Sequence, residues 1–290
     1  MDIPFSRAAR RGERMTDGRH VLPPAAAAFD AVAERFDARY GGWKSVEAQR
    51  RAVRAALLVA FPPGAKLLEI GGGTGEDAAW LARQGREVLL TDVSPIMVRI
   101  AAEKLRWLGL PTPLVAAAER LETISGVVPA PFDGAFSNFA ALNCVTDLTP
   151  VGRGLASLVR PGGRVLLVFF GVCPPGEWVV QVLRGDLRAA FRRASRGAVA
   201  ARLGGRDFPV RYHRERDVVR AMAPAFRLTH RMGIGVFVPP SAAEPWISGH
   251  PRILHSLELL DHLASRPLAF LGDHVLYQFE RTRHLLRPTS

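Results

Sequence analysis

The segment Gly71-Gly72-Gly73-Thr74-Gly75 stands between an apolar run, Lys66–Ile70, and a helical pattern that begins at Glu76. Glycines at such a junction let the backbone turn sharply and let a ligand come close to it. A buried strand, a tight turn and a helix in this order form the first unit of a parallel α/β sheet. The segment therefore constrains both the fold and the place of a ligand.

Strand and helix patterns continue to alternate after this segment. Short apolar runs predict strands at 66–70, 87–91, 112–116, 134–137, 164–169, 226–238 and 274–279. Helical spacing of apolar residues predicts two helices within 25–61, separated by Gly41-Gly42, and further helices at 76–83, 95–108, 178–196, 217–223 and 252–265. Helices that connect parallel strands imply an α/β fold with a doubly wound sheet.

The patterns divide the chain into four expected parts. They are a flexible basic tail (1–24), N-terminal helices with a ligand-binding core (25–170), a helical cap (171–215), and the end of the sheet (216–290) with a second helical insertion (239–272). Both insertions follow strands at their carboxyl ends, where open α/β sheets bind ligands. We expect them to cover the site and shape its substrate pocket.

The composition excludes several classes of protein. Of the 290 residues, 48% are hydrophobic and 23% are charged, which rules against a disordered chain or a disulfide-stapled miniature. The first twenty residues lack the apolar core of a secretory signal. The most apolar run, Val165–Cys173, is about half the ~20 residues that span a bilayer, so no transmembrane segment is expected. The two cysteines form no spaced pattern, and a reducing cytoplasm fits them best.

The basic charge leaves three interpretations open. The net charge is +12, which favours a nucleic acid, an anionic membrane surface or a solvated basic face. In the expected helix 178–196 one stripe is apolar (Val179, Leu183, Leu187 and Phe191) and the opposite stripe is basic (Arg184, Arg188 and Arg192). A cap helix with a solvated arginine face is the simplest interpretation, with contact to a membrane surface or a polyanion as the alternative.

The glycine segment does not fit a phosphate ligand. Glu76 and Asp77 place two carboxylates in the first turn of the helix, where a pyrophosphate would otherwise bind. No Lys-Ser/Thr pair ends the loop, as a nucleoside triphosphate site would require. A cationic or zwitterionic ligand that carries a nucleoside without phosphate fits better. Asp92, 19 residues beyond Gly73 at the end of the second strand, would accept hydrogen bonds from both ribose hydroxyls; its alternative role is a helix cap.

Four motifs together resemble the class I S-adenosylmethionine-dependent methyltransferases, and in particular the small-molecule branch that includes the ubiquinone and menaquinone methyltransferases. They are Glu69-Ile-Gly-Gly-Gly-Thr-Gly75, Asp92, Pro161-Gly-Gly163 and Gly272-Asp-His-Val. The resemblance covers about residues 25–170 well and the last strands loosely. It implies a seven-stranded Rossmann-like sheet whose last strand is antiparallel, with S-adenosyl-L-methionine as cofactor and S-adenosyl-L-homocysteine as product.

The resemblance also implies a set of cofactor contacts. Glu69 and the glycines would surround the methionine part, Asp92 the ribose, and Glu119 the adenine amine, in place of the usual Asp. Tyr40 would close over the cofactor from the N-terminal helices, unless it serves the core. The full set is Glu69, Gly71, Gly72, Gly73, Gly75, Asp92, Val93, Ala118, Glu119, Asn138, Phe139 and Tyr40.

The implied function is methyl transfer to an O, N or C atom of a small hydrophobic metabolite. A hydroxyl or ammonium acceptor needs a base, for which His213 beside Tyr212 is the first candidate; Glu177, His250 and His255 are the others. No metal site is expected. An RNA methyltransferase that uses the arginine-rich stretch 184–216 is an alternative, although the chain lacks the Asn/Asp-Pro-Pro-Tyr/Phe and Pro-Cys motifs of base methylation. A non-catalytic cofactor-binding protein is a further alternative.

Overall fold

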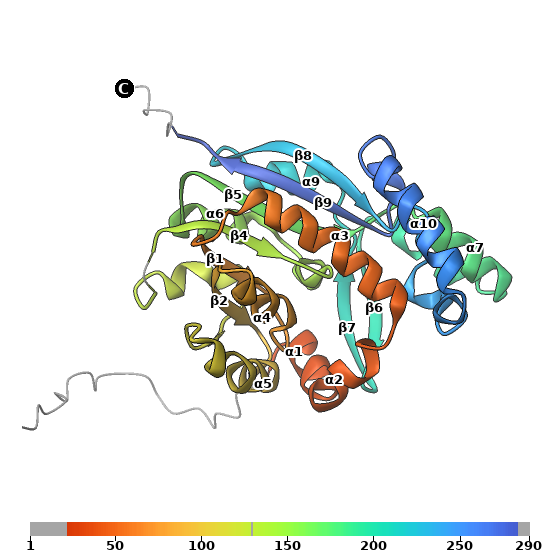
Figure 1. Cartoon of the computed structure of the whole chain (residues 1–290), viewed down its shortest axis with the longest axis horizontal. Coiled ribbons are helices and arrows are strands. Elements are labelled where there is room, and N and C mark those ends of the chain that lie inside the picture. Colours follow the sequence, from red (N-terminus) through yellow and green to blue (C-terminus); the bar gives the residue numbers. More distant parts are fainter. Residues whose placement is uncertain (1–21, 129, 284–290) are drawn as a thin grey trace, which may run out of the picture.

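A computed structural model of the chain describes residues 22–128 and 130–283 (Figure 1). The expected basic tail therefore lies outside the described residues, apart from its last three positions. Within the described ranges no helix combines the length and the apolar character needed to cross a membrane.

The centre of the molecule is a mixed seven-stranded sheet in the order β3-β2-β1-β4-β5-β9-β8. Its strands are β1 (Lys66–Ile70), β2 (Glu87–Asp92), β3 (Leu114–Val115), β4 (Phe132–Ser137), β5 (Val159–Phe170), β8 (Phe226–Ile234) and β9 (His274–Arg281). Neighbouring strands from β3 to β5 are parallel, and β9 is antiparallel to both β5 and β8. The doubly wound α/β sheet with an antiparallel last strand is confirmed, and all seven predicted strands are present.

Ten α-helices occur in the described part of the chain. They are α1 (Pro24–Asp30), α2 (Ala33–Tyr40), α3 (Lys44–Ala60), α4 (Glu76–Arg83), α5 (Pro95–Leu105), α6 (Thr149–Leu158), α7 (Pro175–Leu183), α8 (Leu187–Phe191), α9 (Glu215–Met222) and α10 (Pro251–Ala264). The prediction of two helices before β1 was wrong, since there are three. The unpredicted interruption separates α1 from α2 and follows Asp30. The carboxylate of Asp30 accepts hydrogen bonds from Ser94 and Ile96 at the start of α5.

The core lies on both faces of the sheet. Along β5, Val165, Leu167 and Phe169 face the layer that contains α6 and α9. Leu166 and Val168 face the layer that contains α3, α4 and α5. A central strand buried on both faces reads as one continuous apolar run, which is how this strand was recognised in the sequence.

The segment after β5 differs from the expected helical cap. The predicted helix 178–196 is divided into α7 and α8, because Gly185 is left-handed (φ +77°) and Asp186 caps α8 by accepting a hydrogen bond from Ala189 N at 2.9 Å. A β-hairpin of β6 (Ala198–Leu203) and β7 (Arg206–Arg211) follows. Its turn, Gly204-Gly205, has two positive φ angles, as two-residue hairpins prefer. The sequence analysis overlooked this turn signal.

The hairpin joins the N-terminal helices on one side of the molecule. Phe208 of β7 packs against Phe29 of α1, with ring centroids 5.8 Å apart. Figure 1 shows the hairpin extending from the carboxyl edge of the sheet toward α1 and α2. The second insertion leaves the same edge after β8, because both Phe170 and Ile234 pair with His274. Both insertions thus lie at the edge where parallel sheets bind ligands.

The contact between α6 and α9 provides a test of this packing. A Cβ added to Gly152 would lie 2.1 Å from the carbonyl oxygen of Ala221. We expect Gly152→Ala to lower the free energy of unfolding by about 1–3 kcal/mol, although alanine is the better helix former. Urea denaturation measures the change. Gly126→Ala, where an added Cβ meets nothing within 4 Å, should stay within about 0.5 kcal/mol of the unmodified chain; equal stability of both variants would contradict the packing.

Candidate active site

The glycine loop leaves β1 in a conformation that suits glycine. Gly71, Gly73 and Gly75 have φ angles of +68°, +55° and +82°, in the region that other residues rarely adopt. The amides of Gly71 and Gly72 donate hydrogen bonds to the carbonyl oxygen of Thr91, at 2.8 and 3.1 Å, and so hold the loop against β2. A Cβ added to Gly73 would meet no atom within 4 Å. The loop therefore borders open space on the side of Gly73.

Glu69, the fourth residue of β1, is buried without a complete set of partners. Its side chain lies on β1 with 2% of the residue exposed, and Oε2 has no hydrogen-bond partner in the described part of the chain. Burial, together with Asp77 and Asp92, raises the pKa of Glu69 well above its usual value, although Arg50 and Arg54 oppose the shift. A buried carboxylate oxygen without a partner calls for a donor or a cation from outside the chain.

Asp92 holds the end of β2 to the glycine loop. Its Oδ2 accepts a hydrogen bond from Gly73 N at 2.8 Å, and its Oδ1 accepts one from Ser94 N at 2.9 Å. Burial raises the pKa of Asp92, while the amides of Ser94, Gly73 and Val93 partly offset the shift. The cap of α5 is Ser94, whose Oγ accepts from Met97 N. Each carboxylate oxygen of Asp92 keeps a second lone pair for a ligand hydroxyl.

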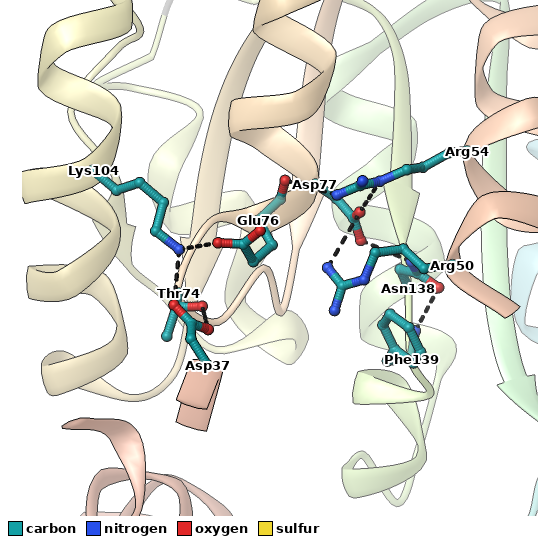
Figure 2. Close-up of polar contacts among 9 residues, drawn as sticks. All are labelled: Asp37, Arg50, Arg54, Thr74, Glu76, Asp77, Lys104, Asn138 and Phe139. Carbon is teal, nitrogen blue, oxygen red and sulfur yellow. Dashed lines mark hydrogen bonds and ion pairs between the residues drawn. The ribbon is translucent and has the colours of Figure 1, made fainter. Parts of the chain in front are cut away.

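Asp77, in the first turn of α4, is paired with two arginines of α3. Its Oδ1 accepts from Arg54 Nε at 2.8 Å and from Arg50 Nη1 at 3.4 Å, and its Oδ2 accepts from Asn138 Nδ2 at 2.8 Å (Figure 2). Lys104 similarly pairs with Glu76. The repulsion of phosphate expected from these two carboxylates is therefore weaker than the sequence indicated, because cations lie beside both of them.

Asn138 and Phe139 follow β4, as the sequence analysis expected, but Asn138 is committed to protein partners. Its Oδ1 accepts a hydrogen bond from Phe139 N at 2.7 Å, and its amide nitrogen binds Asp77. Phe139 and Ala140 have φ angles of +49° and +58°, a strained conformation that is concentrated at functional sites. The guanidinium of Arg50 lies 4.6 Å from the centroid of the Phe139 ring.

Helix α2 is bound to the glycine loop by polar side chains that the sequence analysis missed. Thr74 Oγ1 donates to Asp37 Oδ1 at 2.6 Å, and Lys104 Nζ donates to Asp37 Oδ2 at 2.9 Å (Figure 2). Burial alone would raise the pKa of Asp37, but Thr74 and Lys104 outweigh it and lower this pKa. Tyr40, one turn further along α2, packs between Phe36 and Trp43, at centroid distances of 4.8 and 5.0 Å.

The expected adenine contacts, Ala118 and Glu119, open a short helical segment after β3. They lie near Asp92 and the thiol of Cys144. Burial, together with the charges of Asp92 and Glu119, raises the pKa of Cys144 to about 12. The fold thus brings Asp92 and Glu119 to one region, as a ligand that spans both requires.

The location of His213 does not support its predicted role as a base. The residue is 3% exposed, its Nε2 lies 2.8 Å from the carbonyl oxygen of Val145, and its ring packs on Phe169 at 5.7 Å. Burial lowers its pKa. Tyr212 is half-buried against Phe170, with ring centroids 5.9 Å apart. The sequence identified His213 as a residue able to act as a base, but it did not indicate that the side chain is surrounded by core residues.

The other predicted bases are either buried in ion pairs or exposed on the surface. Glu177 is 2% exposed and forms ion pairs with Arg192 and Arg193, whereas His250 and His255 are exposed. Between residues 22 and 283, leaving out 129, no group of three or more His, Cys, Asp or Glu side chains is arranged to hold a metal ion.

A buried pair at the start of β9, Asp273 and His274, was overlooked as a candidate. Asp273 Oδ1 lies 2.8 Å from Arg193 Nη2, and Oδ2 lies 3.2 Å from His274 Nδ1 and from Gln49 Nε2. Burial would raise the pKa of Asp273, but Arg193 and His274 outweigh it and hold this pKa well below the usual value. The Gly272-Asp-His-Val motif contained this signal.

His274 lies next to the strained segment after β4. Its ring is 4.9 Å from that of Phe170, at an interplanar angle of 30°, and 6.3 Å from that of Phe139 in an edge-on arrangement. Asp273 engages Nδ1 of the imidazole, while the described residues form no hydrogen bond with Nε2. The ring is thus oriented through one nitrogen, as in sites where the other nitrogen performs acid–base chemistry.

Glu69 allows a test in the ligand-free protein. Because its folded-state pKa is raised, its contribution to stability is fully present below the ordinary glutamate pKa and is lost as pH rises through the folded-state pKa. We therefore expect Glu69→Gln to raise the urea midpoint at neutral and alkaline pH and to change it less in acid. Glu103→Gln, at an exposed position, should show no such pH dependence. A lower midpoint for Glu69→Gln at neutral pH would contradict the burial of an ionisable, unpaired carboxylate.

Comparisons with known proteins agree with this geometry. A family model for a methyltransferase domain matches residues 67–163. A ubiquinone/menaquinone biosynthesis C-methyltransferase of Bordetella parapertussis is 31% identical over 207 residues, or 61% of this chain and 74% of that one. The enzyme of the same name from Ralstonia nicotianae is 31% identical over 175 residues, 55% of this chain and 65% of that one, so the chain spans slightly less than two thirds of this relative.

Solved structures share the fold at low sequence identity. A candidate S-adenosylmethionine-dependent methyltransferase from Listeria monocytogenes superposes with a TM-score of 0.56 at 13% identity, covering 83% of this chain and all of that one. The [4+2]-cyclase SpnF gives a TM-score of 0.54 at 16% identity, covering 89% and 96%. The fold alone therefore does not determine the reaction. With the relatives, the motif residues and the sheet order taken together, the chain belongs to the class I S-adenosylmethionine-dependent methyltransferases.

Proposed function

We propose that this protein transfers the methyl group of S-adenosylmethionine to an O, N or C atom of a small hydrophobic acceptor. The observation that carries the proposal is the buried carboxyl oxygen of Glu69 that lacks a partner, next to Gly72 of the glycine loop, where an added Cβ would lie 2.8 Å from the carboxyl carbon. S-adenosylmethionine has an ammonium and a sulfonium group and carries no phosphate. A cation of this kind supplies the partner that Glu69 lacks.

The residues around the loop suit the remaining parts of the cofactor. Asp92 would accept hydrogen bonds from the ribose hydroxyls through the lone pairs that Gly73 and Ser94 leave free. Glu119 would accept from the adenine amine. The main chain of the glycine loop and of Phe139 would enclose the methionine part, and Tyr40 would border it from α2.

The acceptor would lie between Phe139, Phe170 and Tyr212, at the ends of β4, β5 and β7. These rings form an apolar boundary around His274. The curated relatives are named for C-methylation in ubiquinone and menaquinone biosynthesis, and quinol or phenol rings are therefore the first acceptors to screen. RNA is not proposed as the acceptor, because the relatives are named for the methylation of small molecules and Arg193 within the arginine-rich stretch is buried and paired.

The chain's residues would act by position and by proton transfer. When bound, the cofactor supplies an electrophilic methyl carbon with sulfur as the leaving group. Phe139 and Phe170 would exclude water and orient the acceptor for in-line attack. His274 Nε2 would take the proton that the acceptor atom loses, while Asp273 holds the imidazole through Nδ1.

We also propose a cytoplasmic location, since Cys144 and Cys173 are both free thiols.

Calorimetric titration tests cofactor binding. We expect S-adenosylmethionine and S-adenosylhomocysteine to bind with micromolar affinity and NAD not to bind. Asp92→Ala should weaken binding by about 1–3 kcal/mol through lost charge-assisted hydrogen bonds. Glu103→Ala, an exposed carboxylate on α5, is the control. Unchanged affinity for Asp92→Ala would remove this residue from the site, and binding of NAD alone would overturn the proposal.

The role of His274 is tested with an acceptor that the screen identifies. We expect His274→Asn to lower kcat about 10²- to 10⁴-fold for a hydroxyl or ammonium acceptor, with the Kd of S-adenosylhomocysteine within about twofold of the original because the substitution spares the cofactor side. His230→Asn, at an exposed position of β8, should keep full turnover. Full turnover by His274→Asn would exclude the imidazole as the base.

A further inference from the structure

Helix α7 is amphipathic in the reverse of the usual sense. Glu177 and Gln181 are buried on its inner side, while Val179, Val182 and Leu183 are exposed on its outer side, Leu183 to 82%. A helix that caps a soluble domain normally points its apolar stripe inward. The inward face of α7 is instead fixed by the ion pairs of Glu177 with Arg192 and Arg193.

The neighbouring helices also expose apolar residues. Leu187 and Phe191 of α8 are exposed. In α10, Leu254 packs inward on Ile247 and Val238, whereas the opposite side carries four exposed apolar residues: Ile253, Leu259, Leu260 and Leu263. Positions 253, 260 and 263 fall on one stripe of a helix. Leu263 is the most exposed of the four, at 77%.

The two insertions are in contact and present these residues at one end of the molecule. The guanidinium of Arg184, directly after α7, donates to the carbonyl oxygen of Ala242 in the segment that leads to α10. A Cβ added to Gly176 would lie 3.5 Å from Pro240. In Figure 1, α7 and α10 lie together at the end opposite α5. We call the exposed apolar residues of α7, α8 and α10 the roof surface.

Basic side chains outnumber acidic ones around the roof surface. Arg188 and Arg196 are exposed beside Leu187 and Phe191, and Arg252 and Arg266 are exposed at the two ends of α10. On α10, Glu258 is neutralised by its ion pair with Arg51. Asp186 and Asp261 accept hydrogen bonds from backbone amides and keep their charge. These four arginines against two carboxylates leave a net positive charge around the apolar residues.

We propose that the roof surface docks on an anionic lipid bilayer, with its apolar side chains at the boundary between headgroups and acyl chains. Apolar residues with a rim of arginine are the combination that interfacial helices use. A second copy of the chain fits less well, because a two-fold interface would bring the arginine rims of both copies together. The proposal does not rest on the proposed function, although it would place the acceptor site beside the membrane.

Vesicle co-sedimentation of the full chain, without cofactor, tests the proposal. We expect binding to phosphatidylcholine vesicles that contain phosphatidylglycerol and weaker binding to phosphatidylcholine alone. The double variant Leu183→Ser/Leu263→Ser should lower the partition coefficient at least about tenfold, because two apolar side chains no longer leave water. The matched control is Val59→Ser/Trp107→Ser, since both residues are more than 80% exposed and lie outside the roof surface; it should bind as the original chain does.

A second pair of measurements separates charge from apolar contact and from self-association. Arg188→Gln/Arg196→Gln should lower binding to the anionic vesicles and leave binding to phosphatidylcholine unchanged, as added salt should also do. The proposal is overturned if the original chain binds neither vesicle, or if both apolar double variants lose binding equally. It is also overturned if sedimentation shows a dimer that Leu183→Ser/Leu263→Ser dissociates, which would assign the surface to a second copy. Cofactor titration is independent of all three outcomes.

Discussion

The ion pairs of Asp77 hold together the three parts from which the active site is built. The carboxylate lies in the first turn of α4, next to the glycine loop, and binds Arg50 and Arg54 of α3 and Asn138 after β4. The segments α3, the glycine loop and the residues after β4 all meet at the Asp77 carboxylate. The same contacts place the ring of Phe139 beside the guanidinium of Arg50. The arginines leave Glu69 as the carboxylate without a full set of partners.

Local patterns in the sequence predicted where the glycine loop and Asp92 lie in the fold. The glycine loop and Asp92 could be placed because a strand, a turn and a carboxylate at a fixed spacing determine one another within about twenty residues. The features that were missed depend on contacts between distant segments. Asp273 meets Arg193, 80 residues away, and Gln49, 224 residues away, and no periodicity reveals such a cluster. The burial of His213 was not foreseen for the same reason, since it comes from β5 and from the segment that follows β4. The hairpin, by contrast, had a local signal in Gly204-Gly205 that was not used.

The two sides of the site are built by different means. On the proposed cofactor side, main-chain amides and buried carboxylates on β1 and β2 would give rigid, directional hydrogen bonds. On the proposed acceptor side, aromatic rings at the ends of β4, β5 and β7 lie around the oriented imidazole of His274. Rings recognise shape and apolar area more than they recognise particular atoms. This arrangement agrees with one cofactor serving a family whose members differ in what they methylate.

The attachment of α2 has a kinetic consequence. This helix lies between two short non-helical segments, Ala31-Val32 and Gly41-Gly42. Asp37 joins it to the glycine loop through hydrogen bonds with Thr74 and Lys104. Besides the ion pair of Glu34 with Arg99 of α5, its polar attachment consists of these few side-chain bonds, which can open without unfolding the sheet. Release of a spent cofactor from beneath such a segment depends on how often those bonds open. With the cofactor bound as proposed, the residence time of the product would therefore depend on α2.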